Sequence, residues 1–369
     1  MPSSDARERG RRRAAILLPS LSCADATSVD AIRMAETLGR GGWTARVFAG
    51  TSPRDSPAGT VSEAARFLDA GDAVTIYHSG ARWDDGVALL ERTRGAIVVR
   101  DHNVTPPRYF AGISDEFVDA ATLGVEQRAS LARDPRVRRF LAASERNARE
   151  LRAAGAPPDR VRVVPPFHPT DALLREPPDR AALARWQRRP AASFVGRIAP
   201  NKGHLRLLRV AAVHRELFGE PLPLRIVGGA DPRLHRWTAR VERWREQHGV
   251  STSVELCGAV SAGVLKATYL TASVFLCCSE HEGVCVPLIE ATAFGVPIVA
   301  AHEPGVAETL GDAGLVVDGD DDVLATAVHR VRHDAELRER LLSAQRARIA
   351  EAFSVSALTA ALERGLEGV

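Results

Sequence analysis

Short apolar runs alternate with amphipathic helical patterns along almost the whole of this 369-residue chain. Such alternation predicts parallel β-sheets with helices on both faces. The first series of predicted strands comprises Ala14–Leu18, Ala45–Ala49, Ala73–His78, Ile97–Arg100, Phe140–Ala143 and Val161–Val164. The second series comprises Ser193–Val195, Leu224–Val227, Ser253–Leu256, Val274–Cys278, Pro297–Ala300 and Leu315–Val317. We therefore expect an α/β protein with two doubly wound, Rossmann-like sheets.

A proline-rich segment separates the two series. Residues 165 to 178 contain five prolines and little periodicity, which is typical of a linker. A chain with 45% hydrophobic residues and this length can bury two cores. The predicted organisation is a disordered basic tail at residues 1–13, an N-terminal domain at 14–170, a linker at 171–190 and a C-terminal domain at 191–353.

Composition excludes several other classes of protein. The net charge is only +3, which gives no case for a nucleic-acid partner. The five cysteines include no Cys-x-x-Cys pair, and this predicts a reduced, cytoplasmic protein. No apolar stretch approaches the roughly 20 residues that span a bilayer. The apolar run that follows Arg11–Arg13 is too short for a signal peptide and is interrupted by Pro19.

Basic residues gather in one stretch that the pattern predicts to be helical: Arg128, Arg133, Arg136, Arg138 and Arg139. Such a cluster could contact an anionic membrane surface. Acidic residues interleave with it and no large apolar face accompanies it, so a solvated helix face is the preferred interpretation.

Two carboxylates flank an apolar helix start in the second half. The run Val274–Cys278 has the character of a buried parallel strand, so Ser279–Gly283 should leave its carboxyl end, where ligands of open α/β sheets collect. Pro287 suits the first turn of the next helix, and Gly295 suits its end.

The start of this helix has the chemistry of an anion site. The backbone N–H groups of Gly283, Val284, Cys285 and Val286 should point toward a diphosphate or a sugar hydroxyl. Glu290, one turn in, could accept hydrogen bonds from both hydroxyls of a ribose, and Glu282 could reach a sugar. The alternative is that Glu290 only stabilises the helix N-terminus, by about 0.3–1 kcal/mol.

The whole string, Glu-x7-Glu beginning Glu-Gly and followed by Phe-Gly-x-Pro and a strand, resembles the donor-site signature of retaining glycosyltransferases of family 4. The resemblance implies the GT-B fold, in which two Rossmann-like domains face each other across a cleft and the last helix, about 354–369, returns to the first domain. It also implies a nucleotide-sugar donor and a reaction that needs no metal ion. Val284 and Cys285 replace the Phe and Gly that are most common in the string.

A second loop in this half carries two cations. Phe194–His204 contains Gly196, Arg197 and Lys202 after the first predicted strand of the C-terminal domain. As isolated residues they would be surface charges, but the loop resembles the phosphate loop of the same family. Arg197 and Lys202 are then expected to bind the donor diphosphate and to stabilise charge on the leaving phosphate. The segment Gly258–Ser261 resembles the region that receives the nucleotide base, which places Val260 at the donor.

Three residues of the first half follow predicted strands. Arg100–Pro107 resembles the Tyr-His-Asn-Ile-Thr-Pro-Pro segment of one branch of family 4, which implies that His102 contacts the donor sugar, although Asp101 replaces the usual Tyr. Asp25 could hydrogen-bond the acceptor or cap the next helix. His78 could lie beside the acceptor or within the core.

One acidic pair invites a metal interpretation that we do not adopt. Asp318 and Asp320 form an Asp-x-Asp pair, which holds a divalent cation in another class of transferases. Here the pair follows a predicted terminal strand and precedes a helical stretch, where acidic residues favour a turn and a helix start.

The sequence therefore predicts a retaining glycosyltransferase that moves a hexosyl unit from a UDP- or GDP-sugar to an acceptor hydroxyl, with a small specialised metabolite preferred over a lipid or a glycan. Two alternatives stay open. One is a nucleotide-sugar epimerase of the same fold, and the other is a non-catalytic subunit that binds nucleotide sugars. A nicotinamide dehydrogenase is excluded because no Gly-x-Gly-x-x-Gly follows an early strand.

Overall fold

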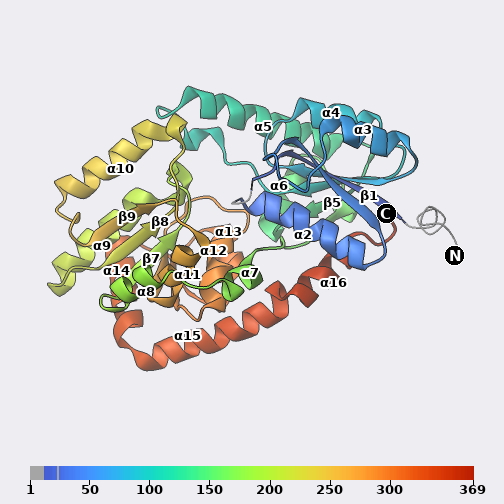
Figure 1. Cartoon of the computed structure of the whole chain (residues 1–369). Coiled ribbons are helices and arrows are strands. Elements are labelled where there is room, and N and C mark those ends of the chain that lie inside the picture. The colour runs from blue at the N-terminus through green and yellow to red at the C-terminus, as the bar shows by residue number, and fades with distance from the viewer. Residues whose placement is uncertain (1–11, 23–24) are drawn as a thin grey trace. The chain divides into compact units, whose positions relative to one another are not determined.

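The computed structural model describes residues 12–22 and 25–369, which separate into two compact units (Figure 1). The first unit comprises the described part of Met1–Pro106 together with Asp119–Pro169 and Ser354–Val369. The second comprises Pro107–Val118 and Thr170–Phe353. Most of the predicted basic tail lies outside the described residues, but Arg13 already belongs to a strand.

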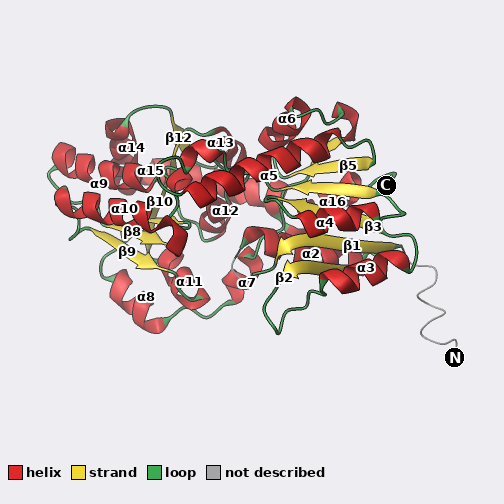
Figure 2. Ribbon diagram, turned by 90° about the horizontal axis from the view of Figure 1, so that it is seen from above, coloured by secondary structure: helices red, strands yellow, loops and turns green. Residues whose placement is uncertain are grey.

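The first unit is built on a six-stranded sheet in the order β2-β1-β3-β4-β5-β6, in which every neighbouring pair is parallel. Its strands are β1 (Arg13–Ser20), β2 (Thr44–Thr51), β3 (Val74–Ser79), β4 (Ile97–Asp101), β5 (Val137–Ala142) and β6 (Val161–Val163). Its helices are α2 (Ala26–Arg40), α3 (Val61–Asp69), α4 (Asp84–Glu91), α5 (Asp115–Arg133, from Asp119 on), α6 (Glu145–Ala153) and α16 (Val355–Gly365). All six predicted strands are present, and Figure 2 shows β2, β1, β3 and β5 among the parallel strands of this sheet.

Both faces of this sheet are buried, as a doubly wound fold requires. Along β1, Leu17 belongs to a core cluster that also contains Phe48. The next residue, Leu18, belongs to a second cluster that includes Met34 of α2 and Leu362 of α16. Because side chains alternate along a strand, the continuous apolar run of β1 fills two cores at once.

The second unit has an equivalent six-stranded parallel sheet in the order β12-β11-β10-β7-β8-β9. Its strands are β7 (Ala191–Val195), β8 (Leu224–Val227), β9 (Val254–Gly258), β10 (Ala272–Cys277), β11 (Ile298–Ala301) and β12 (Leu315–Val317). Its helices include α9 (His204–Phe218), α10 (His235–Gln247), α11 (Ala262–Leu270), α12 (Val286–Ala293), α13 (Pro304–Leu310), α14 (Asp321–His333) and α15 (Ala335–Arg348). The six strands predicted for this half are also present.

The predicted linker at 171–190 is wrong in character. It contains most of α7 (Thr170–Arg175) and all of α8 (Arg180–Gln187), which pack against α11 in the second unit. Trp186 of α8 is buried beneath the guanidinium of Arg225, whose carbon Cζ lies 4.4 Å from the ring centroid. The prolines set the ends of these short helices but do not leave the segment free.

The predicted basic helix face is also wrong. Helix α5 ends at Arg133, and Pro135 precedes β5, so Arg138 and Arg139 are strand residues. Proline cannot continue the helix, which explains the break. Arg128 turns inward and binds the buried carboxylate of Asp101 through Nε at 2.8 Å and Nη2 at 2.9 Å. Among the described residues, no helix has the length and apolar character needed to cross a membrane.

A buried ion pair connects the elements of the first unit. Arg100 of β4 and Asp30 of α2 are both fully buried, and Nε of Arg100 donates to Oδ2 of Asp30 at 2.7 Å. The same guanidinium donates to the carbonyl of Val164 after β6, and the second oxygen of Asp30 accepts the N–H of Phe167 at 2.8 Å. These contacts join one helix, one strand and the chain segment that leaves the sheet.

Replacing Arg100 by leucine is expected to destabilise the first unit by about 3–5 kcal/mol, because Asp30 would remain as a buried, unpaired charge. Chemical denaturation followed by far-UV circular dichroism measures the loss. The matched control is Arg92→Ala, which breaks a half-exposed ion pair with Asp69 and should cost no more than about 1 kcal/mol. Equal losses in the two variants would contradict the role given to the buried pair.

Candidate functional site

Lys202 and Glu282 meet at the carboxyl ends of two strands of the second unit. Nζ of Lys202 donates to both carboxylate oxygens of Glu282, at 2.7 and 2.9 Å. The Lys202 side chain is 22% exposed and the Glu282 side chain is 7% exposed. Burial acts to lower the pKa of Lys202, but the Glu282 carboxylate outweighs it and the pKa is raised. Lys202 therefore remains a cation in this pair.

The loops that carry these two residues are fixed by backbone contacts. Asn201 is buried; its Nδ2 donates to the carbonyl of His281 at 3.2 Å, and its own carbonyl accepts the N–H of Glu280 at 2.9 Å. Gly203 has φ +67°, and a Cβ there would lie 1.8 Å from the carbonyl oxygen of Cys278. The close approach of the two loops thus requires glycine at 203.

Helix α12 begins with the geometry that the sequence predicts. Pro287 lies in its first turn. Cys285, the residue at the N-cap position just before the helix, provides no side-chain cap. Among the described residues, the N–H groups of Gly283, Val284 and Val286 donate to no protein acceptor. Gly283 and Val284 are partly exposed. The positive end of this helix is consequently available to an anion.

Cys285 has the environment of an unreactive thiol. It is buried, and its pKa is raised well above the usual range. The larger cause is a hydrogen bond with Cys277, and the second is burial. Because the thiolate is the nucleophilic form, this supports a packing role and not nucleophilic catalysis.

Glu290 is a buried carboxyl group in α12. It is 5% exposed, and the hydroxyl of Tyr269 in α11 donates to its Oε2 at 2.7 Å. Burial raises the pKa of Glu290 to about 7, an effect that the Tyr269 hydrogen bond partly offsets. At neutral pH this group therefore exchanges easily between its neutral and charged forms.

The other donor residues predicted for the second unit follow β7 and β9. Gly196 extends β7, and its N–H donates to the carbonyl of Val227 at 2.9 Å. Arg197 is exposed and makes no ion pair with any described residue. Val260 is partly buried and precedes Ser261, which caps α11 by accepting the N–H of Val264 at 3.4 Å.

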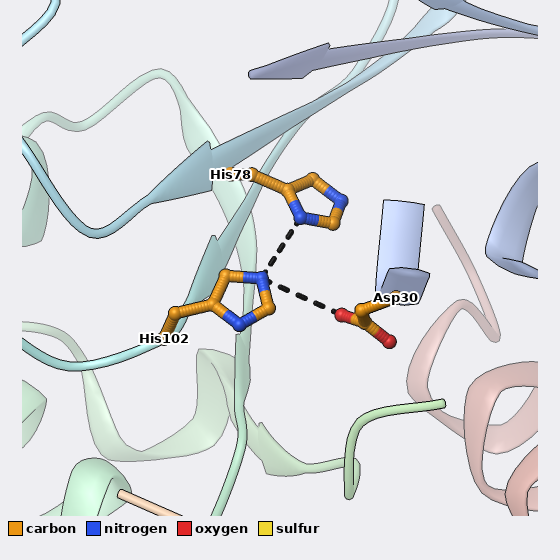
Figure 3. A group of neighbouring side chains, drawn as sticks. All are labelled: Asp30, His78 and His102. Carbon is orange, nitrogen blue, oxygen red and sulfur yellow. Dashed lines mark hydrogen bonds and ion pairs between the residues drawn. The ribbon is translucent and has the colours of Figure 1, made fainter. Parts of the chain in front are cut away.

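In the first unit, His102 and His78 face each other beside Asp30 (Figure 3). Nε2 of His102 lies 2.8 Å from Nδ1 of His78 and 3.4 Å from Oδ2 of Asp30. Burial lowers the pKa of His102 to about 4 although Asp30 opposes the shift. Burial also lowers the pKa of His78 well below its usual value. Both imidazoles are therefore neutral at neutral pH, and Nδ1 of His102 is the ring nitrogen not engaged in this cluster.

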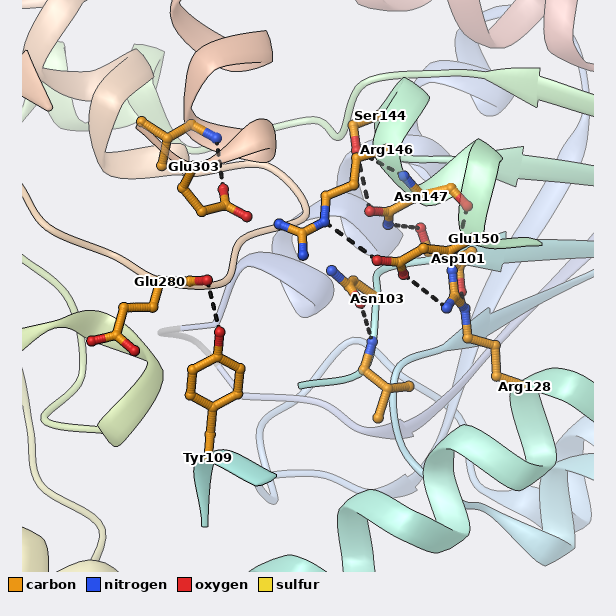
Figure 4. Close-up of polar contacts among 12 residues, drawn as sticks. Asp101, Asn103, Tyr109, Arg128, Ser144, Arg146, Asn147, Glu150, Glu280 and Glu303 are labelled. Atoms are coloured by element: carbon orange, nitrogen blue, oxygen red, sulfur yellow. Dashed lines mark hydrogen bonds and ion pairs between the residues drawn. The ribbon is translucent and has the colours of Figure 1, made fainter. Parts of the chain in front are cut away.

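Asp101 has a structural partner that accounts for its presence. Its buried carboxylate binds Arg128, which also donates to Glu150 at 2.9 Å (Figure 4). Burial raises the pKa of Asp101, and Arg128 acts against that rise. Asp101 thus belongs to an interior network of the first unit. The next residues turn sharply: Asn103 has φ +76°, and its Oδ1 accepts the N–H of Val104 at 2.7 Å.

Asp25 and Asp320 both lie at the N-cap positions of helices. Asp25 caps α2 by accepting the N–H of Ser28 at 2.9 Å, so its contact with an acceptor stays a prediction. Asp320 is the N-terminal cap residue of α14, without a side-chain cap bond.

Sequence reasoning missed Asp30 in the first unit, and Tyr109, Asn201 and Tyr269 in the second unit. Tyr109 donates to the carbonyl of Glu280 at 2.8 Å, as Figure 4 shows, and its ring lies 5.8 Å from that of His281. Tyr109 comes from the segment 107–118 that joins the second unit. The only available signal was the hydroxyl of Tyr269 in a largely apolar helical pattern; Asp30 lies among other polar residues of α2 and gave none.

Comparison with known proteins identifies the domain that contains the Lys202–Glu282 pair. Residues 176–348 match the family model described as glycosyl transferases group 1. These residues form a group 1 glycosyltransferase domain. The resemblance to family 4 glycosyltransferases is therefore confirmed for this part of the chain.

Two curated relatives match the chain over part of their length. A D-inositol 3-phosphate glycosyltransferase of Thermomonospora curvata is 32% identical over 218 residues, which is 55% of this chain and 51% of that protein. A GDP-mannose-dependent alpha-(1-6)-phosphatidylinositol monomannoside mannosyltransferase of Mycobacterium tuberculosis is 28% identical over 230 residues, 58% of each chain. This chain thus spans about half the length of the curated relatives that it matches.

Solved structures extend the similarity of fold to nearly the whole chain. Anabaena HepE in complex with UDP and glucose has a TM-score of 0.78 and 14% identity, with 97% of this chain and all (100%) of that chain covered. Sucrose-phosphate synthase of Thermosynechococcus elongatus has a TM-score of 0.74 and 18% identity, with 96% of this chain and 98% of that chain covered. The two α/β units accordingly form a GT-B glycosyltransferase fold, as predicted.

The buried carboxyl group of Glu290 predicts a pH-dependent stability. Its folded pKa of about 7 exceeds the usual glutamate pKa of 4.5, so between these pH values the folded chain keeps a proton that the unfolded chain releases. The contribution of Glu290 to stability is then fully present below pH 4.5 and is lost as the pH rises to 7. Glu290→Gln removes this pH-dependent contribution. The free energy of unfolding of the variant, relative to that of wild type, should be about 2–3 kcal/mol higher at pH 8 than at pH 5.

Urea denaturation at the two pH values measures this difference. Glu246→Gln on the exposed side of α10 is the control and should change little with pH. The same pH dependence in wild type and Glu290→Gln would rule out a perturbed Glu290.

Proposed function

We propose that this protein is a retaining glycosyltransferase that transfers a hexosyl unit from a nucleoside diphosphate sugar to an acceptor hydroxyl. The observation that carries the proposal is the Lys202–Glu282 pair at the carboxyl ends of β7 and β10, beside the uncapped start of α12. Cation, carboxylate and free N–H groups meet there within one group 1 glycosyltransferase domain.

The diphosphate is assigned to the positive groups. The ammonium of Lys202 has three donors, and two atoms of Glu282 accept from it. The remaining donor can bind a phosphate oxygen without loss of the pair. Arg197, exposed and without an ion-pair partner among the described residues, adds a planar fork that matches a phosphate. The N–H groups of Gly283, Val284 and Val286 complete the set.

The two carboxyl groups take different parts of the donor. Glu290 binds the ribose hydroxyls, with one oxygen already held by Tyr269. Glu282, held by Lys202, accepts hydrogen bonds from hydroxyls of the sugar. This division follows from depth, since Glu290 lies one helical turn beyond the loop that carries Glu282.

His102 orients the reacting sugar as a neutral donor or acceptor. Its pKa of about 4 excludes an imidazolium at neutral pH, so His102 acts through hydrogen bonding and not through charge. The bond from the anomeric carbon to the phosphate oxygen breaks, and a bond to the acceptor oxygen forms on the same face. The released phosphate oxygen takes the acceptor proton, so the reaction needs no metal ion and no other cofactor.

The names of the relatives suggest which substrates to try first. One relative is named for D-inositol 3-phosphate and another for GDP-mannose and a phosphatidylinositol mannoside. HepE has been solved with UDP and glucose. UDP- and GDP-hexoses are the first donors, and inositol, inositol phosphate and other small polyols are the first acceptors. Product with the anomeric configuration of the donor, assigned by NMR, supports retention.

The two alternatives differ from transfer in product. An epimerase would change the donor sugar with no acceptor present, and a non-catalytic subunit would bind the nucleotide and convert nothing. Mass spectrometry of the donor and acceptor pools separates all three.

Calorimetric titration with UDP, GDP, ADP and dTDP in the presence of EDTA tests the donor site. One nucleotide should bind selectively, and Arg197→Ala should weaken it at least tenfold because a charge-assisted contact to phosphate is lost. Arg236→Ala, which removes an exposed arginine of α10, is the control. Failure of all four nucleotides to bind would overturn the donor assignment.

Two alanine variants should separate binding from transfer. Glu290→Ala is expected to weaken nucleotide binding at least tenfold, whereas His102→Ala should slow transfer of a labelled sugar and leave nucleotide affinity within about threefold. Turnover of His102→Ala at the wild-type rate would remove His102 from the mechanism.

A further inference from the structure

Two histidines and a glutamate, residue types that can bind a metal ion, come together in the second unit and have no part in the proposed reaction. They are His214 on α9, Glu220 just after that helix, and His329 on α14. Nδ1 of His329 lies 3.4 Å from Nε2 of His214 and 3.9 Å from Oε1 of Glu220, and all three atoms lie within 4.8 Å of one another. Helices α9 and α14 pack side by side (Figure 1).

The hydrogen bonds of His214 present the correct nitrogen to this cluster. Nδ1 of His214 lies 3.2 Å from the carbonyl oxygen of Glu220. A carbonyl only accepts, so Nδ1 carries the proton and Nε2 keeps its lone pair toward His329. Metal-bound histidines are held in the same way, with the second ring nitrogen donating to a backbone carbonyl.

The ring of His329 is also fixed before any ligand arrives. It stacks on Phe218 with centroids 3.8 Å apart and an interplanar angle of 5°. His333 follows one turn later on α14, with its ring centroid 4.3 Å from that of His329. Its Nδ1 lies 2.9 Å from the carbonyl of His329, so Nε2 of this exposed residue is the nitrogen that can still bind a ligand.

The carboxylate is poorly satisfied by the protein. Oε1 of Glu220 is shielded from solvent and accepts no hydrogen bond from the described residues. Its nearest cation is Arg332, whose Nη1 is 3.7 Å away and is itself buried without a hydrogen bond. An ion pair that satisfied Glu220 would be shorter and hydrogen-bonded.

We propose that His214, Glu220 and His329 bind one Zn²⁺ ion, with His333 or water as the fourth ligand. Two imidazole nitrogens on a tetrahedral zinc lie about 3.3 Å apart, given Zn–N bonds of about 2.0–2.1 Å, which matches the His214–His329 separation. Oε1 of Glu220, 3.9 Å from Nδ1 of His329, must approach the two histidines to bind the same ion, and its side chain, 47% exposed, has room to turn. Imidazole ligands favour zinc over magnesium or calcium.

The ion would connect α9 to α14 and so stabilise the second unit. It takes no part in sugar transfer, because none of its ligands belongs to the residues assigned to the donor or the acceptor. The site therefore stands or falls independently of the proposed activity.

Zinc titration of the full-length, untagged, EDTA-treated protein tests the site. One Zn²⁺ per chain should bind by calorimetry, and Co²⁺ should give the visible absorption of a tetrahedral complex. His329→Gln and His214→Gln should each weaken binding at least tenfold, and zinc should raise the thermal midpoint of the wild type but not of His329→Gln. Arg332→Met should tighten binding because it removes a competing cation.

His248→Gln is the matched control. Like His333, His248 places its Nδ1 close to the carbonyl of the residue four positions earlier, here 2.9 Å from the carbonyl oxygen of Trp244. Among the described residues, it belongs to no group that could hold a metal ion. Its affinity for zinc should equal that of wild type. Absence of zinc binding, or binding that His329→Gln leaves unchanged while circular dichroism shows a folded variant, would overturn the proposal.

Discussion

The first unit depends on the buried carboxylate of Asp30. Its carboxylate accepts hydrogen bonds from Nε of Arg100 and from the N–H of Phe167, and its Oδ2 lies 3.4 Å from Nε2 of His102. A buried charge is stable only when its oxygens are satisfied, so Asp30 holds β4 and the chain after β6 in fixed positions. The same oxygen that binds Arg100 orients the histidine assigned to the sugar. The packing of this unit and the position of its candidate functional residue are therefore not separable.

The second unit positions its site by close backbone contact. Besides Gly203 against Cys278, a Cβ on Gly305 would lie 2.2 Å from the carbonyl oxygen of Glu282. The start of helix α13 thus packs directly on the loop that carries Glu282. Glu303 caps this helix by accepting the N–H of Val306 at 2.9 Å. Tyr109 supports that loop through Glu280. A loop held from several sides can keep a carboxylate in place without the help of a ligand.

The strands could be predicted because a parallel strand buried on both faces reads as an uninterrupted apolar run, and all twelve runs became strands. The start of α12 was predictable because Pro287 carries a local signal. Residues 171–190 misled because prolines mark both linkers and the ends of short helices, and only burial of Trp186 distinguishes the two. Pairings such as Glu290 with Tyr269 or Asp30 with Arg100 join residues far apart in sequence, so no pattern announces them.

The balance of charge around α12 supports the proposed diphosphate ligand. Lys202 is matched by Glu282, and Glu290 has a pKa of about 7, so burial suppresses much of its negative charge. Among the described residues, Arg197 forms no ion pair, and no side chain caps the positive end of the helix. A ligand that carries its negative charge at the phosphates, and hydroxyls at both ends, satisfies all of them together. A free sugar would offer no negative charge to Arg197, and a bare phosphate would offer no hydroxyl to Glu282 or Glu290, which is why the proposed donor is a nucleotide sugar.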